Sequence, residues 1–347
     1  MAVLLPGIIS PRSPIDFLKT AYNFSIMDIT STNTAPFRFG LLLVDGFALM
    51  SYSAVVEPLR AANLLAGAEL YDIRQIPAAG EQSETSSGAL IPATEPAGRQ
   101  EDYHLLLVFA GGDPNQFQDR HIFAWLRRLD RRGVRLGGVS GGPVILANAG
   151  LMQGRRMTVH WEHAAMLKES HPELIVERSL YVMDRDRITV AGGIAPLDMM
   201  HALITEHHGP DFARQVSDWY MHTDIRPSGG PQRAGIAERY HITSPALIQS
   251  IEAMENHIAD PLSLDQLTLF SGTGPRQLNR LFQEKLGCRT MGFYRSLRLE
   301  KARGLLTLTP LTITDVALAT GFASSAHFAS AFRDEYGTSP SAYRSGL

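Results

Sequence analysis

Cysteine is almost absent from this chain, since Cys288 is the only one among 347 residues. A single cysteine excludes a disulfide framework and a cysteine-rich metal site, and it is typical of a reducing compartment. Long apolar runs are lacking too, because no stretch approaches the roughly 20 residues that span a bilayer. No motif indicates a metal or a cofactor. We therefore expect a cytoplasmic protein with no membrane partner, no metal and no cofactor.

Net charge is also small, at −3 from 32 basic and 35 acidic residues, so the whole chain does not indicate a polyanionic partner. The basic residues are unevenly placed, however. Between Arg276 and Arg303 there are eight lysines and arginines against two glutamates. A charge run is most often a solvated helix face, so its meaning depends on the pattern around it.

The sequence around this basic run contains two copies of one small helical unit. Ser263 and Thr312 each have an amide or acid three residues later, which is the spacing of a capping box at a helix start. Each start leads into a short apolar-periodic helix that stops at Gly272 or Gly321, and an offset of 49 residues separates both pairs. A second helix follows each glycine. Helix, glycine turn, helix is the helix-turn-helix arrangement, which lays its second helix in a DNA major groove.

Between the copies, residues 290–308 are predicted to form one longer helix with a basic polar side. Five motifs lie in this part of the chain: Arg276-Gln-Leu-Asn-Arg-Leu-Phe, Arg298-Leu-Glu-Lys-Ala-Arg, Gly321-Phe, His327-Phe and Gly337-Thr-Ser-Pro-Ser-Ala-Tyr-Arg344. Together they resemble the DNA-binding domain of AraC-type transcription regulators, over residues 244–347. Gly274 and Thr268 depart from the family pattern, which has a serine cap and a small alanine there. Pro275 suits a first helical position, so we expect that helix to persist.

The polar faces of the two second helices supply the candidate base readers. We expect one helix to read bases through Arg276, Gln277, Asn279 and Arg280, and the other through Ser324, Ser325 and His327, with Arg333 beside them. The partner is double-stranded DNA, contacted in two successive grooves one turn, or roughly 10 bp, apart. We also expect a homodimer, associated with the nucleoid, that contacts RNA polymerase.

Upstream, residues 37–222 alternate short apolar runs with helical patterns. The predicted strands are 39–44, 71–77, 104–109, 134–139 and 188–191, and the predicted helices are 52–65, 116–131, 143–149, 161–169 and 196–207. This alternation indicates an α/β domain with a doubly wound, mostly parallel sheet in a flavodoxin-like sandwich, followed by an all-α domain. The Pro- and Gly-rich residues 223–243 are the predicted linker, and residues 1–36 are predicted to be a disordered leader.

One junction of the α/β domain, Gly138-Val-Ser-Gly-Gly142, follows a predicted strand and precedes a helix. It fits G-x-S-x-G, the strained turn that exposes the nucleophile of serine hydrolases, here Ser140. His160 and Glu162 lie downstream, but the serine, acid, histidine order of those enzymes is not evident. Alone in a Gly-rich turn, the motif is a weak indication of hydrolysis.

Other segments of this domain are Val44-Asp-Gly-Phe, Glu57-Pro-Leu-Arg-Ala-Ala-Asn63, Phe109-Ala-Gly-Gly112, Thr158-Val-His-Trp-Glu162 and Ala191-Gly-Gly. With the Ser140 junction they resemble the PfpI-type, class I glutamine-amidotransferase-like domain, and with the C-terminal motifs they resemble the GlxA-like regulators. In catalytic relatives the residue at this turn is a cysteine, assisted by a glutamate and a histidine that match Glu57 and His160. A serine is a poor nucleophile unless a base activates it, so we expect a pocket that binds without catalysis.

The expected ligand site comprises six residues: Glu57, Gly111, Gly112, Ser140, His160 and Trp161. Backbone N–H groups at the glycines and after Ser140 suit a carboxylate. Glu57 offers a negative charge, and Trp161 offers an aromatic face for a cation. A small zwitterion satisfies both ends, and the resemblance implies arginine, glycine betaine, carnitine or a related amine. The plain alternatives are that Trp161 is a core or interdomain packing residue, that His160 is structural and that Glu57 is a surface acid.

The function we expect is a ligand-responsive transcription regulator, an activator of a catabolic operon, and not an enzyme. Two alternatives stay open: a serine-dependent hydrolase or amidase with a DNA-binding tail, and a DNA-binding protein whose α/β domain only dimerises. Saturable binding without turnover would support the regulator, and turnover that is lost in Ser140→Ala would support the hydrolase. Failure of any small amine to shift stability or DNA affinity would support the domain that only dimerises.

Overall fold

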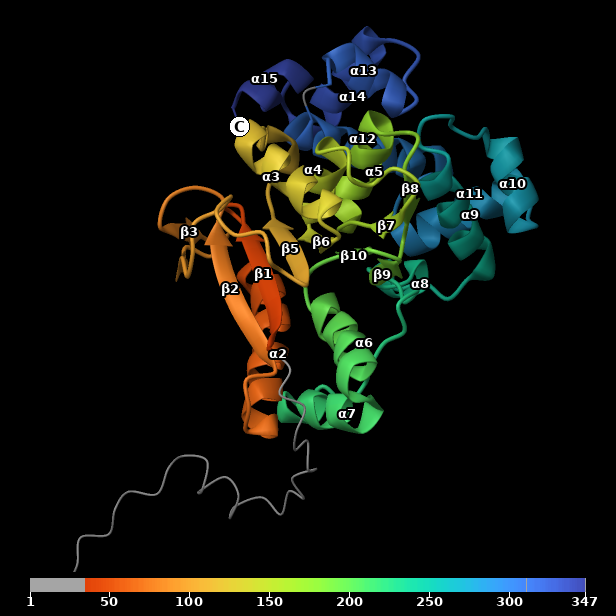
Figure 1. Cartoon of the computed structure of the whole chain (residues 1–347). Coiled ribbons are helices and arrows are strands. Elements are labelled where there is room, and N and C mark those ends of the chain that lie inside the picture. The colour runs from red at the N-terminus through yellow and green to blue at the C-terminus, as the bar shows by residue number, and fades with distance from the viewer. Residues whose placement is uncertain (1–34, 310, 347) are drawn as a thin grey trace, which may run out of the picture.

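The computed structural model describes residues 35–309 and 311–346, which form an α/β domain and a helical domain (Figure 1). The predicted leader, residues 1–36, lies almost wholly outside the described residues. Within the described part, none of the helices combines the length and apolar content that crossing a membrane requires.

A six-stranded sheet with the order β2-β1-β5-β6-β10-β9 forms the centre of the α/β domain. Its strands are β1 (Phe37–Leu43), β2 (Tyr71–Pro77), β5 (Leu105–Ala110), β6 (Arg135–Ser140), β9 (Tyr181–Asp184) and β10 (Arg187–Val190). Every neighbouring pair is parallel except β9 with β10, so the predicted mostly parallel sheet is confirmed. The antiparallel edge strand β9 was not predicted. Two small sheets were missed as well, because three-residue strands are too short to show alternation: β3 (Gln82–Glu84) with β4 (Leu90–Pro92), and β7 (Arg156–Thr158) with β8 (Ile175–Glu177).

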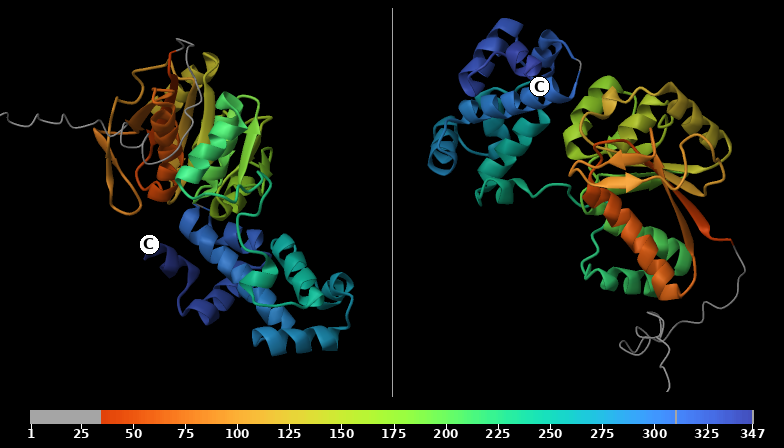
Figure 2. Two further views of the ribbon diagram at one scale, coloured as in Figure 1. Left: turned by 90° about the horizontal axis from the view of Figure 1, so that it is seen from below. Right: turned by 90° about the vertical axis from the view of Figure 1, so that its left-hand side faces the viewer.

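Helices cover both faces of this sheet (Figures 1 and 2). One face carries α2 (Leu49–Ala66), α6 (Ala195–His208) and α7 (Pro210–Trp219), and the other carries α3 (Arg120–Arg131), α4 (Gly142–Asn148) and α5 (Trp161–Ser170). Strand β1 serves both cores, because alternate side chains point to opposite faces. Phe39 and Leu41 are buried in the first core and Leu42 in the second. This two-sided burial explains why the strands are apolar runs in the sequence.

Helix α3 begins later than predicted, at Arg120 rather than at residue 116. The carboxylate of Asp119 accepts hydrogen bonds from the backbone N–H groups of His121 and Ile122, at 2.8 and 3.1 Å, and so caps the helix. A short 3-10 turn, η1 (Pro114–Gln116), occupies the residues before it.

The helical domain contains α9 (Pro245–Asn256), α10 (Leu264–Ser271), α11 (Pro275–Leu286), α12 (Thr290–Leu308), α13 (Ile313–Ala319), α14 (Ser325–Tyr336) and α15 (Pro340–Ser345). The long helix α12 lies between two small cores. It contributes Tyr294 to the core that also holds Leu278 and Phe282, and Ala302 to the core that also holds Phe328. The predicted pair of helix-turn-helix units joined by one long helix is therefore confirmed.

Both predicted capping boxes are present. Ser263 Oγ accepts from Gln266 N at 3.2 Å, and the Gln266 side chain accepts from Ser263 N at 2.8 Å. Thr312 and Asp315 repeat the exchange at 3.1 and 3.2 Å. Each box satisfies backbone N–H groups that a helix start leaves without a partner. Helix α11 begins at Pro275 after Gly274, so it persists without the family's serine cap.

The predicted linker is attached to the α/β domain by polar side chains. Arg226 Nη2 lies 2.6 Å from a carboxylate oxygen of the fully buried Asp198 on α6. Further along, the side-chain amide of Gln232 donates to the Ser179 carbonyl oxygen at 2.7 Å. Helix α8 (Ile236–Arg239) then begins the helical domain. Its first residue, Ile236, packs against the core of that domain. The composition predicted a linker, but not that its polar residues bind the sheet domain.

Candidate functional site

Ser140 ends β6 and stands at the sharp turn into α4. Its φ is +61°, a left-handed conformation that residues with a Cβ rarely adopt. The turn closes because the neighbouring residues are glycines. A Cβ at Gly142 would lie 1.9 Å from the Val108 carbonyl oxygen, and one at Gly192 would lie 2.8 Å from the Ser140 Cβ. The predicted strained turn between strand and helix is thus confirmed.

A cavity of about 460 Å³ opens beside Ser140, a size suited to a small ligand. Its lining from the α/β domain comprises Gly46, Ala48, Ser86, Gly111, Gly112, Ser140, His160, Glu162 and His163, and its lining from the helical domain comprises Arg303, Gly304, Thr307 and Tyr343. The fold therefore brings four of the predicted ligand residues together. These are Gly111 and Gly112, which follow β5, Ser140, which ends β6, and His160, which precedes α5. We refer to this cavity as the Ser140 pocket.

Two histidines from the start of α5 line the Ser140 pocket. His160 is tied to the turn, because its backbone N–H donates to the Ser140 carbonyl oxygen at 3.2 Å. Burial lowers the pKa of His160, although Glu162 acts in the opposite direction. His163 is only 3% exposed, and burial lowers its pKa to about 4, so its imidazole is neutral at pH 7. Its Nδ1 is buried and has no hydrogen-bond partner among the described residues.

The arrangement around Ser140 differs from that of a serine nucleophile. A nucleophilic serine needs a base within hydrogen-bond reach, roughly 2.6–3.2 Å. In the described part of the chain no hydrogen bond joins the Ser140 hydroxyl to His160, whose Nδ1 instead accepts from Glu162 N at 3.4 Å. Nor do the described residues hold a group of three or more His, Cys, Asp or Glu side chains placed to bind a metal ion.

Glu57 does not reach the Ser140 pocket, contrary to the expectation that it faces the ligand. The segment after β1 approaches the pocket at Ala48, and Glu57 lies nine residues further along α2, roughly 13 Å down the helix axis. Its side chain is 43% exposed and pairs with Arg60 Nε at 2.7 Å. The Tyr220 hydroxyl, from the end of α7, lies 3.4 Å from the same carboxylate.

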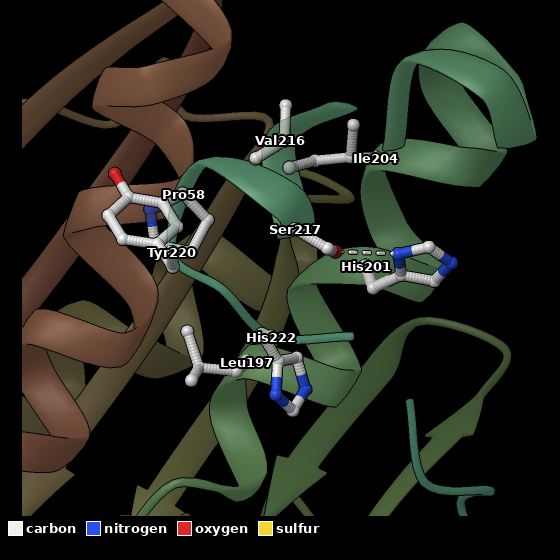
Figure 3. A pocket seen from close by; sticks show the side chains of 8 residues that line it. All are labelled: Pro58, Leu197, His201, Ile204, Val216, Ser217, Tyr220 and His222. Carbon is white, nitrogen blue, oxygen red and sulfur yellow. Dashed lines mark hydrogen bonds between the residues drawn. The ribbon is translucent and has the colours of Figure 1, made fainter. Parts of the chain in front are cut away.

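A second cavity lies near Glu57, between α2, α6 and α7 (Figure 3). It is lined by Pro58, Leu197, His201, Ile204, Val216, Ser217, Tyr220 and His222. Its volume is about 10 Å³, which is room for one water at most. Figure 3 also shows that His201 Nδ1 and Ser217 Oγ already bond to each other, at 2.9 Å. No effector fits here, so the Ser140 pocket is the candidate site.

Trp161 also lies outside the lining of the Ser140 pocket. Its ring is 41% exposed, and the guanidinium carbon of Arg233, from the linker, stands 4.3 Å from the ring centroid. The expected cation–π contact is therefore occupied by a cation of the chain itself. Trp161 attaches the linker to the α/β domain, which corresponds to the alternative in which it packs between domains.

The charged side chains of the pocket are Glu162 and Arg303, and neither was predicted as a ligand residue. Glu162 could have been found, since it closes the Thr158-Val-His-Trp-Glu162 motif and stands two residues after His160. Arg303 carried no local signal, because it reaches the pocket only through the docking of α12 beside α5.

The predicted base readers lie on the two second helices of the helix-turn-helix units. Arg276, Gln277 and Arg280 are exposed on α11, while His327 and Arg333 are exposed on α14. The apolar residues of both helices are turned into the two small cores, which leaves these polar side chains on the outside, where Arg280 Nε lies 3.7 Å from Glu284 Oε1.

The other three predicted base readers have hydrogen bonds within the protein or are partly buried. Asn279 Oδ1 accepts from Thr290 N at 3.2 Å, so this side chain joins α11 to the start of α12. Ser324 Oγ accepts from His327 N at 3.2 Å and caps α14. Ser325, the first residue of α14, is half-buried.

The polar side of α12 is only partly the open basic face that the charge run indicated, because Arg295 and Arg303 are exposed while other basic side chains serve the fold. Arg298 donates to the Thr320 and Gly321 carbonyl oxygens, at 2.7 and 2.6 Å, and braces the second turn. Lys301 is half-buried near charged side chains of the α/β domain, and burial lowers its pKa to about 8. Basic side chains that serve packing and the domain boundary cannot be told from DNA contacts by their spacing.

Two family models match the chain, the DJ-1/PfpI family over residues 38–206 and a helix-turn-helix domain over residues 270–346. The HTH-type transcriptional regulator GlxA of Rhizobium meliloti is 45% identical over 88% of this chain and 95% of its own length. The HTH-type transcriptional regulator CdhR of Pseudomonas aeruginosa is 41% identical over 89% of this chain and 92% of its own length. Among solved structures, an AraC family transcriptional regulator from Pseudomonas putida aligns with a TM-score of 0.50 and 25% identity, over 53% of this chain and all of that one.

Proposed function

Since the chain belongs to the family of GlxA-type transcriptional regulators, in which a DJ-1/PfpI domain precedes an AraC-type DNA-binding domain, we propose that a small zwitterionic amine controls its binding to DNA. The amine binds in the Ser140 pocket, and the helical domain reads the operator. The Ser140 pocket carries this proposal, because its lining holds one acidic and one basic side chain beside a strained serine, whose hydroxyl makes no hydrogen bond to a base among the described residues.

The lining of the pocket supports a ligand with two opposite charges. Backbone N–H groups at Gly111 and Gly112 are hydrogen-bond donors that suit a carboxylate. Glu162 takes the role that the sequence suggested for Glu57 and faces the cationic group. Glycine betaine, carnitine and arginine belong to this class of ligand.

DNA recognition rests on the exposed side chains of α11 and α14. Arg276, Gln277 and Arg280 read one major-groove segment, and His327 and Arg333 contact the next. Removal of a base reader costs about 1–3 kcal/mol and relaxes the preference at one base position, whereas removal of a phosphate contact weakens all sequences alike.

The regulator acts in the cytoplasm, at the nucleoid, as a homodimer that activates a catabolic operon through RNA polymerase. The exposed Leu269 of α10 and Leu318 of α13 support a protein partner. They occupy equivalent positions of the two helix-turn-helix units, and both side chains are more than half exposed. We expect no covalent chemistry in the α/β domain, since within the described residues no hydrogen bond joins the Ser140 hydroxyl to a base.

A thermal-shift screen of the full chain with glycine betaine, carnitine and L-arginine tests the proposed effector class. A ligand at 100 times its dissociation constant adds about 2.7 kcal/mol to the stability, which is a readily measured rise in Tm. Product release during incubation with an amide or ester would favour a hydrolase. No rise with any small amine would favour a domain that serves only dimerisation.

Replacement of Glu162 by Gln tests the charge of the pocket. Because this carboxylate is partly exposed, the loss for a cationic ligand should be about 1 kcal/mol, or roughly fivefold in affinity by calorimetry. A neutral isostere of the same shape should bind equally well to both proteins. Glu57→Gln is the matched control, since it removes the same charge outside the pocket and should leave the affinity unchanged. Equal losses in the two variants would contradict the assignment.

A further inference from the structure

We propose that the effector site is shared between the two domains, with Arg303 of the DNA-binding domain binding the carboxylate of the effector. This inference rests on the proposed function of the Ser140 pocket. It assigns a ligand-binding role to a domain that otherwise contacts DNA, and it makes the bound effector a bridge between sensing and DNA recognition.

The geometry of the pocket carries the proposal. Arg303, Gly304 and Thr307 come from α12 and Tyr343 from α15, and together they form the wall opposite the α/β domain. Helix α12 packs beside α5 (Figure 1). His160 is the residue before α5, and Glu162 lies in its first turn. At Gly304 an added Cβ would meet no atom within 4 Å, so the helix presents an open surface to the cavity.

The charges of the pocket are divided between the domains. Glu162 belongs to the α/β domain and Arg303 to the helical domain, and both line the same cavity. Among the residues that the structure describes, no ion pair within 4.0 Å joins Arg303 to a carboxylate, and its guanidinium lies 5.3 Å from the Tyr336 ring. A guanidinium binds a carboxylate through two parallel hydrogen bonds. A zwitterion therefore fits with its cationic end at Glu162 and its carboxylate at Arg303, to which the backbone N–H groups at Gly111 and Gly112 are further donors.

A ligand that contacts both domains changes the DNA-binding domain through its own contacts. Such a ligand shifts the equilibrium between docked and open domains toward the docked state. The size of the shift equals the ratio of its affinities for the two states. By reciprocity, operator DNA that prefers the docked arrangement raises the affinity for the effector by the same factor. The linker supports this coupling, since Arg226 and Gln232 attach it to the α/β domain on the way to α8.

Substitutions on α12 of the full chain test the shared site, with glycine betaine and L-arginine as probes in calorimetry. Gly304→Leu inserts a side chain into the cavity from the helical domain and should weaken both probes by about tenfold or more, because it competes for their space. Gly292→Leu is the matched control on the same helix. An added Cβ there also meets nothing within 4 Å, and the residue does not line the cavity. Its affinity should stay within about twofold of the wild type.

Arg303→Gln tests the carboxylate contact itself, with choline as a probe that has the ammonium group but no carboxylate. Loss of a charge-assisted hydrogen bond should weaken glycine betaine by about tenfold. Choline should bind Arg303→Gln as well as it binds the wild type, which a merely structural role of Arg303 would not predict.

The outcomes separate the two proposals. If the wild type binds glycine betaine or arginine and the Gly304→Leu and Arg303→Gln variants bind it equally well, the shared site is wrong and the effector class stands. If the wild type binds neither probe at millimolar concentration, the proposed effector class fails and the shared site fails with it.

Discussion

Ser140 contributes a hydroxyl and a backbone turn to the pocket, and its value to a ligand is that of one hydrogen bond. We therefore expect Ser140→Ala to weaken glycine betaine by about 0.5–1.5 kcal/mol, measured by calorimetry. The substitution should not change the backbone strain at this position, where φ is +61°, because Ala and Ser both carry a Cβ. An acyl adduct on Ser140, detected by mass spectrometry after incubation with an ester or amide, would contradict a purely binding role.

His163 makes the stability of the chain depend on pH. Its pKa is about 4 in the folded protein and 6.5 when unperturbed. Between these values the unfolded chain binds a proton that the folded chain does not, so the free energy of unfolding should fall as the pH decreases through this range. The loss from this group is on the order of 3 kcal/mol.

The variant His163→Gln removes the titrating group and should flatten that part of the pH profile in urea denaturation. Some slope should persist, because burial also lowers the pKa of His160. A profile as steep as that of the wild type would show that His163 is not the group responsible.

The residues of the pocket show which site positions a sequence can reveal. Gly111, Gly112 and Ser140 were predictable because the carboxyl ends of parallel strands meet at one edge of the sheet. Glu57 was misplaced because a family motif gives an order along the chain and not the distance along α2. Arg303 could not be predicted, since its place depends on how two domains dock.

Two capping boxes begin the first helices of the helix-turn-helix units, and each should contribute to the stability of its own unit. We expect Ser263→Ala and Thr312→Ala each to lower the free energy of unfolding by about 1 kcal/mol. The two effects should add in the double variant, because the boxes lie beside different cores.

Urea denaturation measures both effects, and Gly274→Ser provides a control in the opposite direction. It adds the missing cap to α11 and should stabilise by a few tenths of a kcal/mol. A Thr312→Ala variant as stable as the wild type would mean that the box adds nothing to folding.

At the level of elements, length decided what the sequence could predict. The long strands and helices carry enough apolar residues to be recognised, and β2 was predicted at its observed bounds, Tyr71–Pro77. The three-residue strands β3, β4, β7 and β8 hold too few residues for a period. The function of a helix face was harder still, since Arg298 and Lys301 of α12 serve packing although they belong to a basic run.

In the whole molecule, the pocket and the recognition helices belong to one connected arrangement. Helix α12 lines the Ser140 pocket with Arg303 and is joined to α11 through Asn279 and Thr290. The same helix lies against the core of the second unit. A ligand in the pocket therefore touches the helix on which both helix-turn-helix units are built. The sequence predicted the two domains, but their docking is a tertiary contact with no local signature.

The affinity of the full chain for its operator, with and without saturating glycine betaine or L-arginine, tests the central claim most directly. The operator is first selected from random duplexes by the protein and then titrated by fluorescence anisotropy. Allosteric coupling is typically worth about 1–3 kcal/mol, so we predict a change of roughly 5- to 150-fold in operator affinity, reduced in Glu162→Gln and kept in Glu57→Gln. An operator affinity that stays the same while the amine binds saturably would contradict the account.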